Sequence, residues 1–150
     1  MKRLDILQII FMASLLASVA FCYFLFMEKN DGEIFNEDHF NSHRHDFLYG
    51  IDYCRIRANT AQIEGWSTIK SGQKNTETNI YIEKSRGLFK KLQKITVVRP
   101  DVSKKLKAYG FYDRSGFLAS TRDSSLGNSI IIEINDNNNG EKYAKKIKCR

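Results

Sequence analysis

Charged side chains are absent from residues 6–27, although they make up 27% of the 150-residue chain. An α-helix crosses the roughly 30 Å hydrocarbon core of a bilayer with about 20 apolar residues, and only a helix satisfies its own backbone hydrogen bonds there. The run therefore predicts a single transmembrane α-helix. Lys2 and Arg3 precede it, whereas Lys29 is the only basic residue among the sixteen positions that follow. The positive-inside bias predicts a cytoplasmic tip at residues 1–5 and an extracytoplasmic remainder.

A cleaved signal peptide is the alternative for this segment. Ser18-Val19-Ala20 is a small-x-small sequence of the kind found at cleavage sites. The apolar run continues to Met27, however, and so exceeds the roughly 7–15 residues of an ordinary signal core. We favour an uncleaved signal-anchor in the inner or cytoplasmic membrane, with the C-terminal domain periplasmic or extracellular.

Histidine is missing after position 45, and this absence excludes a histidine base from residues 46–150. A nucleophile at Cys54 or Cys149 would need an imidazole base, and Ser115 lacks the G-x-S-x-G elbow of a hydrolase. The ten acidic residues after position 46 form carboxylate pairs by chance. We therefore predict that the chain is not an enzyme and that it has no catalytic residue and no cofactor. An enzyme whose site no motif reveals is the weaker alternative.

Charge is distributed unevenly along the chain. Residues 28–46 hold two basic and six acidic side chains, whereas residues 47–150 hold 20 basic and 10 acidic side chains. The first stretch has low hydrophobicity and is predicted to be an acidic spacer. The second is a basic domain that can meet anionic glycans or lipid headgroups of an envelope, and nucleic acid is not an expected partner. A solvated, lysine-rich surface is the plainer interpretation of any single lysine.

The three histidines, His39, His43 and His45, all fall in this predicted spacer. Imidazoles spaced by four and two residues can chelate zinc or copper. No cysteine joins them, and a mobile spacer leaves the geometry of a metal site unspecified. The sequence therefore predicts no metal site.

Hydrophobic and polar residues alternate through much of residues 47–150, a pattern typical of half-buried strands. Pro100 followed by Val102 and Leu106 predicts one short helix. We predict an all-β fold, an antiparallel immunoglobulin-like sandwich of about seven strands, in which this helix crosses between the sheets. A turn is predicted at Ser71-Gly72. The predicted strands are 53–57, 60–69, 80–83, 88–98, 115–121, 130–135 and 143–149.

Cys54 and Cys149 are the only two cysteines outside the apolar run. An oxidising compartment would allow them to pair, and closing a loop of this length contributes roughly 4–5 kcal/mol in the chain-entropy model. Two small buried thiols are the alternative. Both interpretations stay open, because a sequence does not supply the Cα separation that a disulfide demands.

Three phrases occur in order, Ile63-Glu64-Gly65-Trp66, Arg99-Pro100-Asp101-Val102 and Ser115-Gly116-Phe117. Together they resemble a small β-sandwich domain of bacterial envelope proteins, which is attached to membrane-bound glycan-modifying or glycosyltransferase proteins or stands alone behind one membrane helix. The resemblance covers roughly residues 48–148 and implies the fold and its location. Ser67 departs from the small apolar residue expected after the tryptophan.

Trp66 itself has two interpretations. It is the core tryptophan of the sandwich, or it is an exposed platform for a sugar ring, with Arg99 and Asp101 as polar partners. Arg99 and Asp101 also suit a structural ion pair.

Our leading hypothesis is a membrane-anchored extracytoplasmic binding or accessory module of the bacterial cell envelope, which recognises an anionic glycan noncovalently. The alternative is a structural or assembly subunit that contacts another membrane protein through its helix or a sheet edge.

Overall fold

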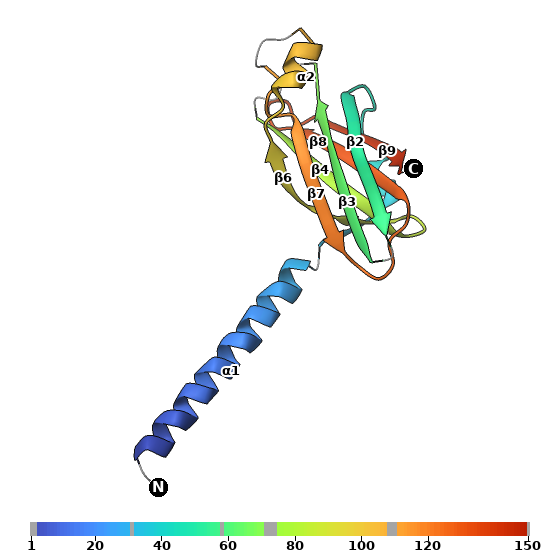
Figure 1. Ribbon diagram of the computed structural model, residues 1–150. Coiled ribbons are helices and arrows are strands. Elements are labelled where there is room, and N and C mark those ends of the chain that lie inside the picture. The colour runs from blue at the N-terminus through green and yellow to red at the C-terminus, as the bar shows by residue number, and fades with distance from the viewer. Residues whose placement is uncertain (1–2, 31, 58, 71–74, 108–110, 150) are drawn as a thin grey trace. The chain divides into compact units, whose positions relative to one another are not determined.

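The computed structural model describes residues 3–30, 32–57, 59–70, 75–107 and 111–149. The chain divides into two units, Met1–Asp31 and Gly32–Arg150, which are described separately (Figure 1). The predicted turn at Ser71-Gly72 and the first two residues of the predicted cytoplasmic tip lie outside the described residues.

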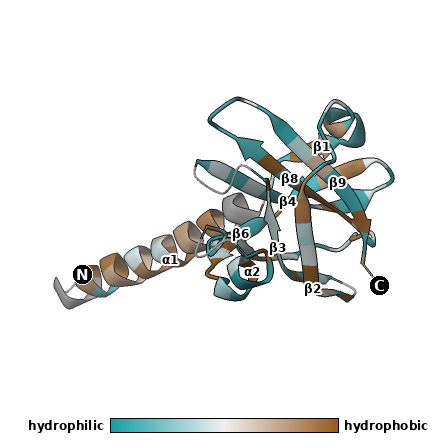
Figure 2. Cartoon of the chain, turned by 90° about the horizontal axis from the view of Figure 1, so that it is seen from above, coloured by the Kyte–Doolittle hydropathy of each residue, from teal (hydrophilic) through white to brown (hydrophobic). Residues whose placement is uncertain are grey.

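The first unit is one helix, α1 (Arg3–Asn30). Its segment Ile6–Met27 is long and apolar enough to cross a membrane, and none of it is buried against protein. Hydrophobic residues recur along its length (Figure 2). A helix with apolar side chains on every face does not fit the surface of a soluble domain. The predicted helix is therefore present, and its length meets the requirement for a span.

The second unit contains nine described strands in two antiparallel sheets, which confirms the prediction of an all-β sandwich. One sheet has the order β1-β5-β4-β8-β9 and the other β2-β3-β7-β6 (Figure 1). The strands are β1 (Ile34–Asn36), β2 (Leu48–Arg57), β3 (Thr60–Thr68), β4 (Thr76–Ser85), β5 (Leu88–Lys91), β6 (Gln93–Val97), β7 (Gly116–Arg122), β8 (Ser129–Asp136) and β9 (Lys142–Lys148).

The chain passes from one sheet to the other at Leu92. The single strand predicted over residues 88–98 is in fact two, because β5 belongs to the five-stranded sheet and β6 to the four-stranded sheet. Leu92 is 5% exposed and packs in the core between the sheets. A continuous hydrophobic and polar alternation cannot reveal such a switch, because both strands keep the same period.

The predicted short helix is present as α2 (Pro100–Lys105), with proline in its first turn and Asp101 near its N-terminus. It joins β6 to β7, which are neighbours in the four-stranded sheet. The prediction that it crosses between the sheets is therefore wrong, and the change of sheet between β5 and β6 falls at Leu92 instead. α2 lies over one end of the sandwich (Figure 1), where Val102 packs with Trp66 and Tyr112.

Inward-facing residues of the two sheets form the main core, as the alternation of each strand predicts. Its fully buried members include Ile63, Ile80, Ile82, Phe117, Ile130, Ile132 and Ile134. β8 is buried on its other face as well, where Ile131 and Glu133 are each 2% exposed. Another part of the chain therefore covers the outer face of the five-stranded sheet.

The cover is formed by residues that the sequence assigns to an acidic spacer. β1 pairs with β5, a 3₁₀ helix η1 (Glu37–Phe40) follows it, and Phe40 is 5% exposed. Phe40 packs with Tyr81, Phe89 and Ile131 in a second, smaller core, with Phe35 against it. The prediction of a spacer over residues 28–46 is therefore wrong from Gly32 onward, where the folded unit begins. Two aromatic anchors order a segment whose average composition is polar.

A disulfide joins Cys54 to Cys149, with 5.6 Å between their Cα atoms. Cys54 lies in β2, an edge strand of the four-stranded sheet, and Cys149 directly follows β9, an edge strand of the other sheet. The bond therefore links the two sheets along one side of the sandwich. Of the two interpretations that the sequence leaves open, the structure contains the disulfide.

Candidate functional site

Trp66 lies at the end of β3, in the cluster that it forms with Val102 and Tyr112. It is 8% exposed, so too little of its ring reaches the surface to stack on a sugar. Its neighbour Ser67 is fully buried, and the hydroxyls of Ser67 and Thr78 lie 3.2 Å apart. That contact between the sheets accounts for a polar residue where a small apolar one is expected. Trp66 fits the core interpretation, and the platform interpretation does not fit.

Arg99 is held by two carboxylates. Its Nε and Nη2 atoms donate to the two carboxylate oxygens of Asp101 over 2.8 and 2.7 Å, and its Nη1 donates to Asp52. The hydrogen bond with Asp101 is the main reason that the pKa of Arg99 is raised, and the same bond lowers the pKa of Asp101. The guanidinium thus joins β2 to the start of α2. The ion pairs of Arg99 with Asp101 and Asp52 are structural contacts, and few N–H donors of Arg99 remain for a ligand.

The three sequence phrases at residues 63–66, 99–102 and 115–117 meet at this end of the sandwich. Gly65 and Trp66 pair with Phe117 and Gly116 across β3 and β7, and Val102 of α2 packs on Trp66. A Cβ atom on Gly116 would lie 2.5 Å from Arg99 Cγ. These residues therefore form one packing unit at this end of the sandwich.

A cavity of about 490 Å³ opens between the two sheets beside β4 and β6. Lys94, Thr96 and Val98 reach it from β6 and the residue after it, at the alternate positions that face the opposite sheet. Thr76 and Thr78 of β4 line the other side. The hydrophobic core thus gives way to polar residues at this edge. Asn75, Arg114, Gly116 and Phe117 complete the lining.

Two cations line this cavity, and the side chains of Lys94 and Arg114 form no hydrogen bond or ion pair with a described residue. Burial is the main reason that the pKa of Lys94 is lowered, with Lys91 acting in the same direction and Glu77 opposing it. A cation that has lost part of its hydration without forming an ion pair favours an anionic ligand.

A second polar cluster lies on the outer face of the five-stranded sheet, beneath the segment that contains η1. Glu133 of β8 accepts hydrogen bonds on Oε2 from Tyr81 Oη at 2.8 Å and from Asn79 Nδ2 at 3.1 Å. Its Oε1 lies 3.2 Å from Nε2 of His43, and only 4% and 3% of the His43 and Glu133 side chains are exposed. Burial, aided by the bond to Glu133, raises the pKa of Tyr81. Burial is also the main reason that the pKa of His43 is lowered, although Glu133 acts against it.

His39 completes this cluster at the surface. One ligand atom each from His39, His43 and Glu133 lies within 4.8 Å of the other two. The prediction of no metal site depends on a mobile backbone, and the structure orders that backbone. It brings together two of the three histidines that the sequence singles out and adds Glu133, which the sequence does not.

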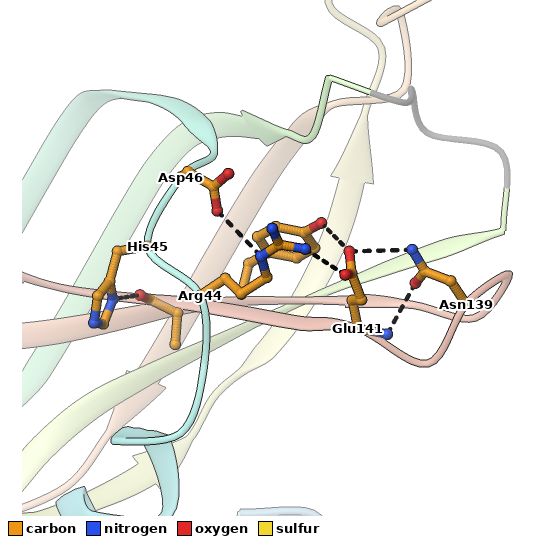
Figure 3. A network of polar contacts seen from close by, with 7 residues as sticks. Arg44, His45, Asp46, Asn139 and Glu141 are labelled. Carbon is orange, nitrogen blue, oxygen red and sulfur yellow. Dashed lines mark hydrogen bonds and ion pairs between the residues drawn. The ribbon is translucent and has the colours of Figure 1, made fainter.

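His45 takes no part in the cluster. Its Nδ1 donates to the carbonyl of Ala144 at 2.7 Å (Figure 3). Beside it, Arg44 forms ion pairs with Asp46 and Glu141. The backbone of Arg44 also bonds to β9, donating to Lys142 O at 2.9 Å and accepting from Ala144 N at 2.8 Å. This network fastens the segment that carries His43 to the edge of the sheet.

Glu141 is the centre of the network in Figure 3. It accepts hydrogen bonds from Tyr143 Oη at 2.6 Å and from Asn139 Nδ2 at 3.1 Å. The bond from Tyr143 is the main reason that the pKa of Glu141 is lowered. The groups here are saturated with protein partners, so the network holds structure and offers little to a ligand.

No family model, curated protein or solved structure matches the chain.

Proposed function

We propose that the chain is a membrane-anchored binding module whose sandwich recognises an anionic carbohydrate of the bacterial cell envelope. The observation that carries the proposal is the cavity beside β4 and β6, in which the side chains of Lys94 and Arg114 form no ion pair with a described residue. Threonine hydroxyls line the same cavity and suit the hydroxyl groups of a sugar. The proposed mechanism is noncovalent and assigns no catalysis to the chain.

The anchor in this proposal is α1, inserted with its N-terminus in the cytoplasm. The segment Ile6–Met27 has the length and composition of a span, and Lys2 and Arg3 lie on its N-terminal side. The disulfide between Cys54 and Cys149 supports an oxidising compartment for the sandwich. Anchoring would raise the effective concentration of the module near an envelope polymer, so a weak site would suffice.

The three phrases around Trp66 support kinship with small envelope β-sandwich domains, which we retain as part of the proposal. They pack together at one end of the fold, as residues that specify a fold do. They do not line the cavity that we assign to the ligand, apart from Gly116 and Phe117.

Retention on immobilised polymers tests the proposed function. The full-length chain in nonionic detergent is passed over a polyuronate, a phosphate-containing polymer and a neutral glucan, at rising salt concentration. We expect retention on an anionic polymer that weakens with salt, because screening acts on Lys94 and Arg114, and little retention on the glucan. Comparison of the uronate and phosphate columns identifies the anionic group. Failure to bind either anionic polymer, or equal binding to the neutral glucan, would overturn the proposal.

An assembly subunit is the second candidate, and one feature favours it. β6 is an edge strand that pairs with β7 alone among the described strands. Ile95 on it and Val98 beyond it are 62% and 66% exposed. An open edge with apolar side chains can add a strand from a partner protein. A photo-crosslinking residue at position 95 in intact cells distinguishes the two functions, since one specific protein adduct would favour assembly.

A further inference from the structure

We propose that His39, His43 and Glu133 bind a zinc ion on the outer face of the five-stranded sheet. His39 lies in η1, His43 follows η1, and Glu133 lies in β8. His43 and Glu133 are 90 positions apart in the sequence. Two imidazoles and one carboxylate form a ligand set that suits zinc. The inference concerns a different face from the cavity beside β4 and β6 and does not depend on the proposed function.

The spacing of the two buried ligands fits a tetrahedral ion. Two atoms that each lie about 2.0–2.1 Å from a tetrahedral zinc ion stand roughly 3.3 Å apart. His43 Nε2 and Glu133 Oε1 are 3.2 Å apart. An ion can therefore take the place of the hydrogen bond between these atoms with only a small reorientation of the two side chains. The buried part of the site is already arranged for coordination.

His39 supplies the third ligand from the surface side. It is exposed, its ring centroid lies 5.6 Å from that of His43, and its ligand atom lies within 4.8 Å of the other two. An exposed side chain can close the remaining distance by rotation of its own torsions. Three protein ligands leave a fourth position of the tetrahedron for water, as in other zinc sites with two histidines and one glutamate.

The carboxylate is positioned by groups behind it. Tyr81 and Asn79 both donate to Oε2 of Glu133, which leaves Oε1 to face His43. Hydrogen bonds of this kind orient metal ligands and raise affinity. Phe40 and Phe89 lie in the same small core as Tyr81 and restrict water on the protein side.

The second ring nitrogen of His43, Nδ1, is buried and has no hydrogen-bond partner among the described residues. With zinc on Nε2, Nδ1 carries the ring hydrogen of the neutral imidazole. Lys142 acts electrostatically on His43 and opposes a cation there, whereas the single negative charge of Glu133 favours one. A site with one carboxylate and two neutral imidazoles would hold zinc with a net charge of about one.

Zinc titration of the full-length chain in nonionic detergent, purified without a polyhistidine tag, tests the inference. We expect calorimetry with ZnCl₂ to show one ion per chain, and thermal melts to shift upward because the ion binds only the folded state. Co²⁺ in place of zinc should give the visible absorption of a tetrahedral site. The absence of binding at micromolar zinc would overturn the inference.

Single variants separate a built site from adventitious binding by surface histidines. His39→Ala removes an exposed ligand and should leave the fold intact, and its affinity for zinc should fall at least about 100-fold, since loss of an outer-shell partner alone costs roughly 10–100-fold. Tyr81→Phe should weaken binding within that outer-shell range. His45→Ala is the matched control, because His45 lies near the cluster but outside it, and its affinity should stay within about threefold of wild type. Equal affinity in His39→Ala and wild type, or equal losses in His39→Ala and His45→Ala, would overturn the inference.

Discussion

Trp66 lies directly across from Gly50 in the pairing of β2 with β3, and its indole Nε1 stands 2.5 Å from the position that a Cβ atom on residue 50 would occupy. The indole therefore uses the space that the missing side chain leaves. A Cβ on Gly65 would in turn lie 2.4 Å from the carbonyl oxygen of Gly50. The core position of Trp66 depends on two glycines in adjacent strands, which allow a close approach of backbone and ring.

Gly50→Ala should lower the free energy of unfolding by about 1–3 kcal/mol, because the new methyl group overpacks a rigid indole. Urea denaturation of the full-length chain in detergent measures the change. The matched test is the same substitution in a Trp66→Phe background, where the smaller ring leaves room and the cost of Gly50→Ala should be smaller. Equal costs in the two backgrounds would show that the ring is not the obstacle.

A buried lysine provides a second prediction. Lys90 is 6% exposed, and its Nζ donates to Asp123 Oδ2 at 3.1 Å, while Lys84 approaches the same oxygen at 3.3 Å. Burial alone would raise the pKa of Asp123, but the hydrogen bonds from these two lysines outweigh it and hold the pKa below its usual value. Asp123→Asn should cost about 2–3 kcal/mol at pH 7, because it leaves a buried ammonium without its counter-ion.

The sign of the pH dependence follows from the lowered pKa. The stability that Asp123 contributes is complete above the unfolded-state pKa near 4 and is lost as the pH falls through the lower pKa of the folded state. The stability difference between wild type and Asp123→Asn should therefore shrink below about pH 4. Asp46→Asn is the control, since Asp46 forms a surface pair with a 67% exposed side chain and should cost less than about 1 kcal/mol. A difference that grows in acid would contradict the assignment.

The fold was largely predictable from the sequence, since the inward positions of β3, β4 and β8 alternate as half-buried strands do. The segment that covers the outer face of the five-stranded sheet was not predictable in this way. Phe35 and Phe40 stand among acidic residues, and averaging over residues 28–46 hides two aromatic anchors. The change of sheet at Leu92 was equally invisible, because it keeps the period of two.

The residues of the candidate sites are likewise hard to predict from the sequence pattern alone. Glu133 alternates with Ile132 and Ile134, so the pattern places it on a solvent face, yet the 34–46 segment buries that face. A strand that is covered on both sides cannot be recognised from one alternating polar residue. The three histidines are themselves a usable signal, but the low hydrophobicity of residues 28–46 predicts a mobile segment without the fixed geometry of a metal site. Lys94 and Arg114 are two of many basic residues in the sequence, and only the packing of the two sheets places them in one cavity.

Lys94→Gln combined with Arg114→Gln tests the cavity directly. Retention on the anionic polymer that binds wild type should fall about tenfold or more, because two hydrogen-bonded ionic contacts contribute about 1.5–3 kcal/mol each before screening. Lys104→Gln with Lys148→Gln is the matched control, since both lysines are exposed and lie outside the cavity. The control removes the same net charge and should weaken retention only slightly. Equal losses in the two variants would indicate a diffuse electrostatic attraction without a site.

The disulfide should contribute strongly to stability, because it closes a loop between positions 95 residues apart. The chain-entropy model gives about 4–5 kcal/mol for such a loop, with less where the reduced state retains structure. Urea denaturation with and without reductant measures the difference. Cys22→Ser should change nothing, since Cys22 is a free cysteine. Rapid labelling of Cys54 and Cys149 in the folded, oxidised protein would contradict the bond.

The oxidation state of the disulfide between Cys54 and Cys149 can be used to test in which compartment the sandwich lies. If α1 exports the domain, Cys54 and Cys149 in the full-length chain should resist thiol labelling in intact cells until a reductant is added, because the space outside the cytoplasmic membrane is oxidising. A variant without residues 1–27 should remain in the cytoplasm, where glutathione and thioredoxin keep thiols reduced, and both cysteines should react in freshly lysed cells. Replacing Lys2 and Arg3 by glutamate should mis-orient part of the full-length population and produce a reduced fraction, since the basic flank sets the orientation. Complete oxidation of the truncated variant would contradict the link between export and pairing, and full reduction of the wild-type chain would contradict the proposed topology.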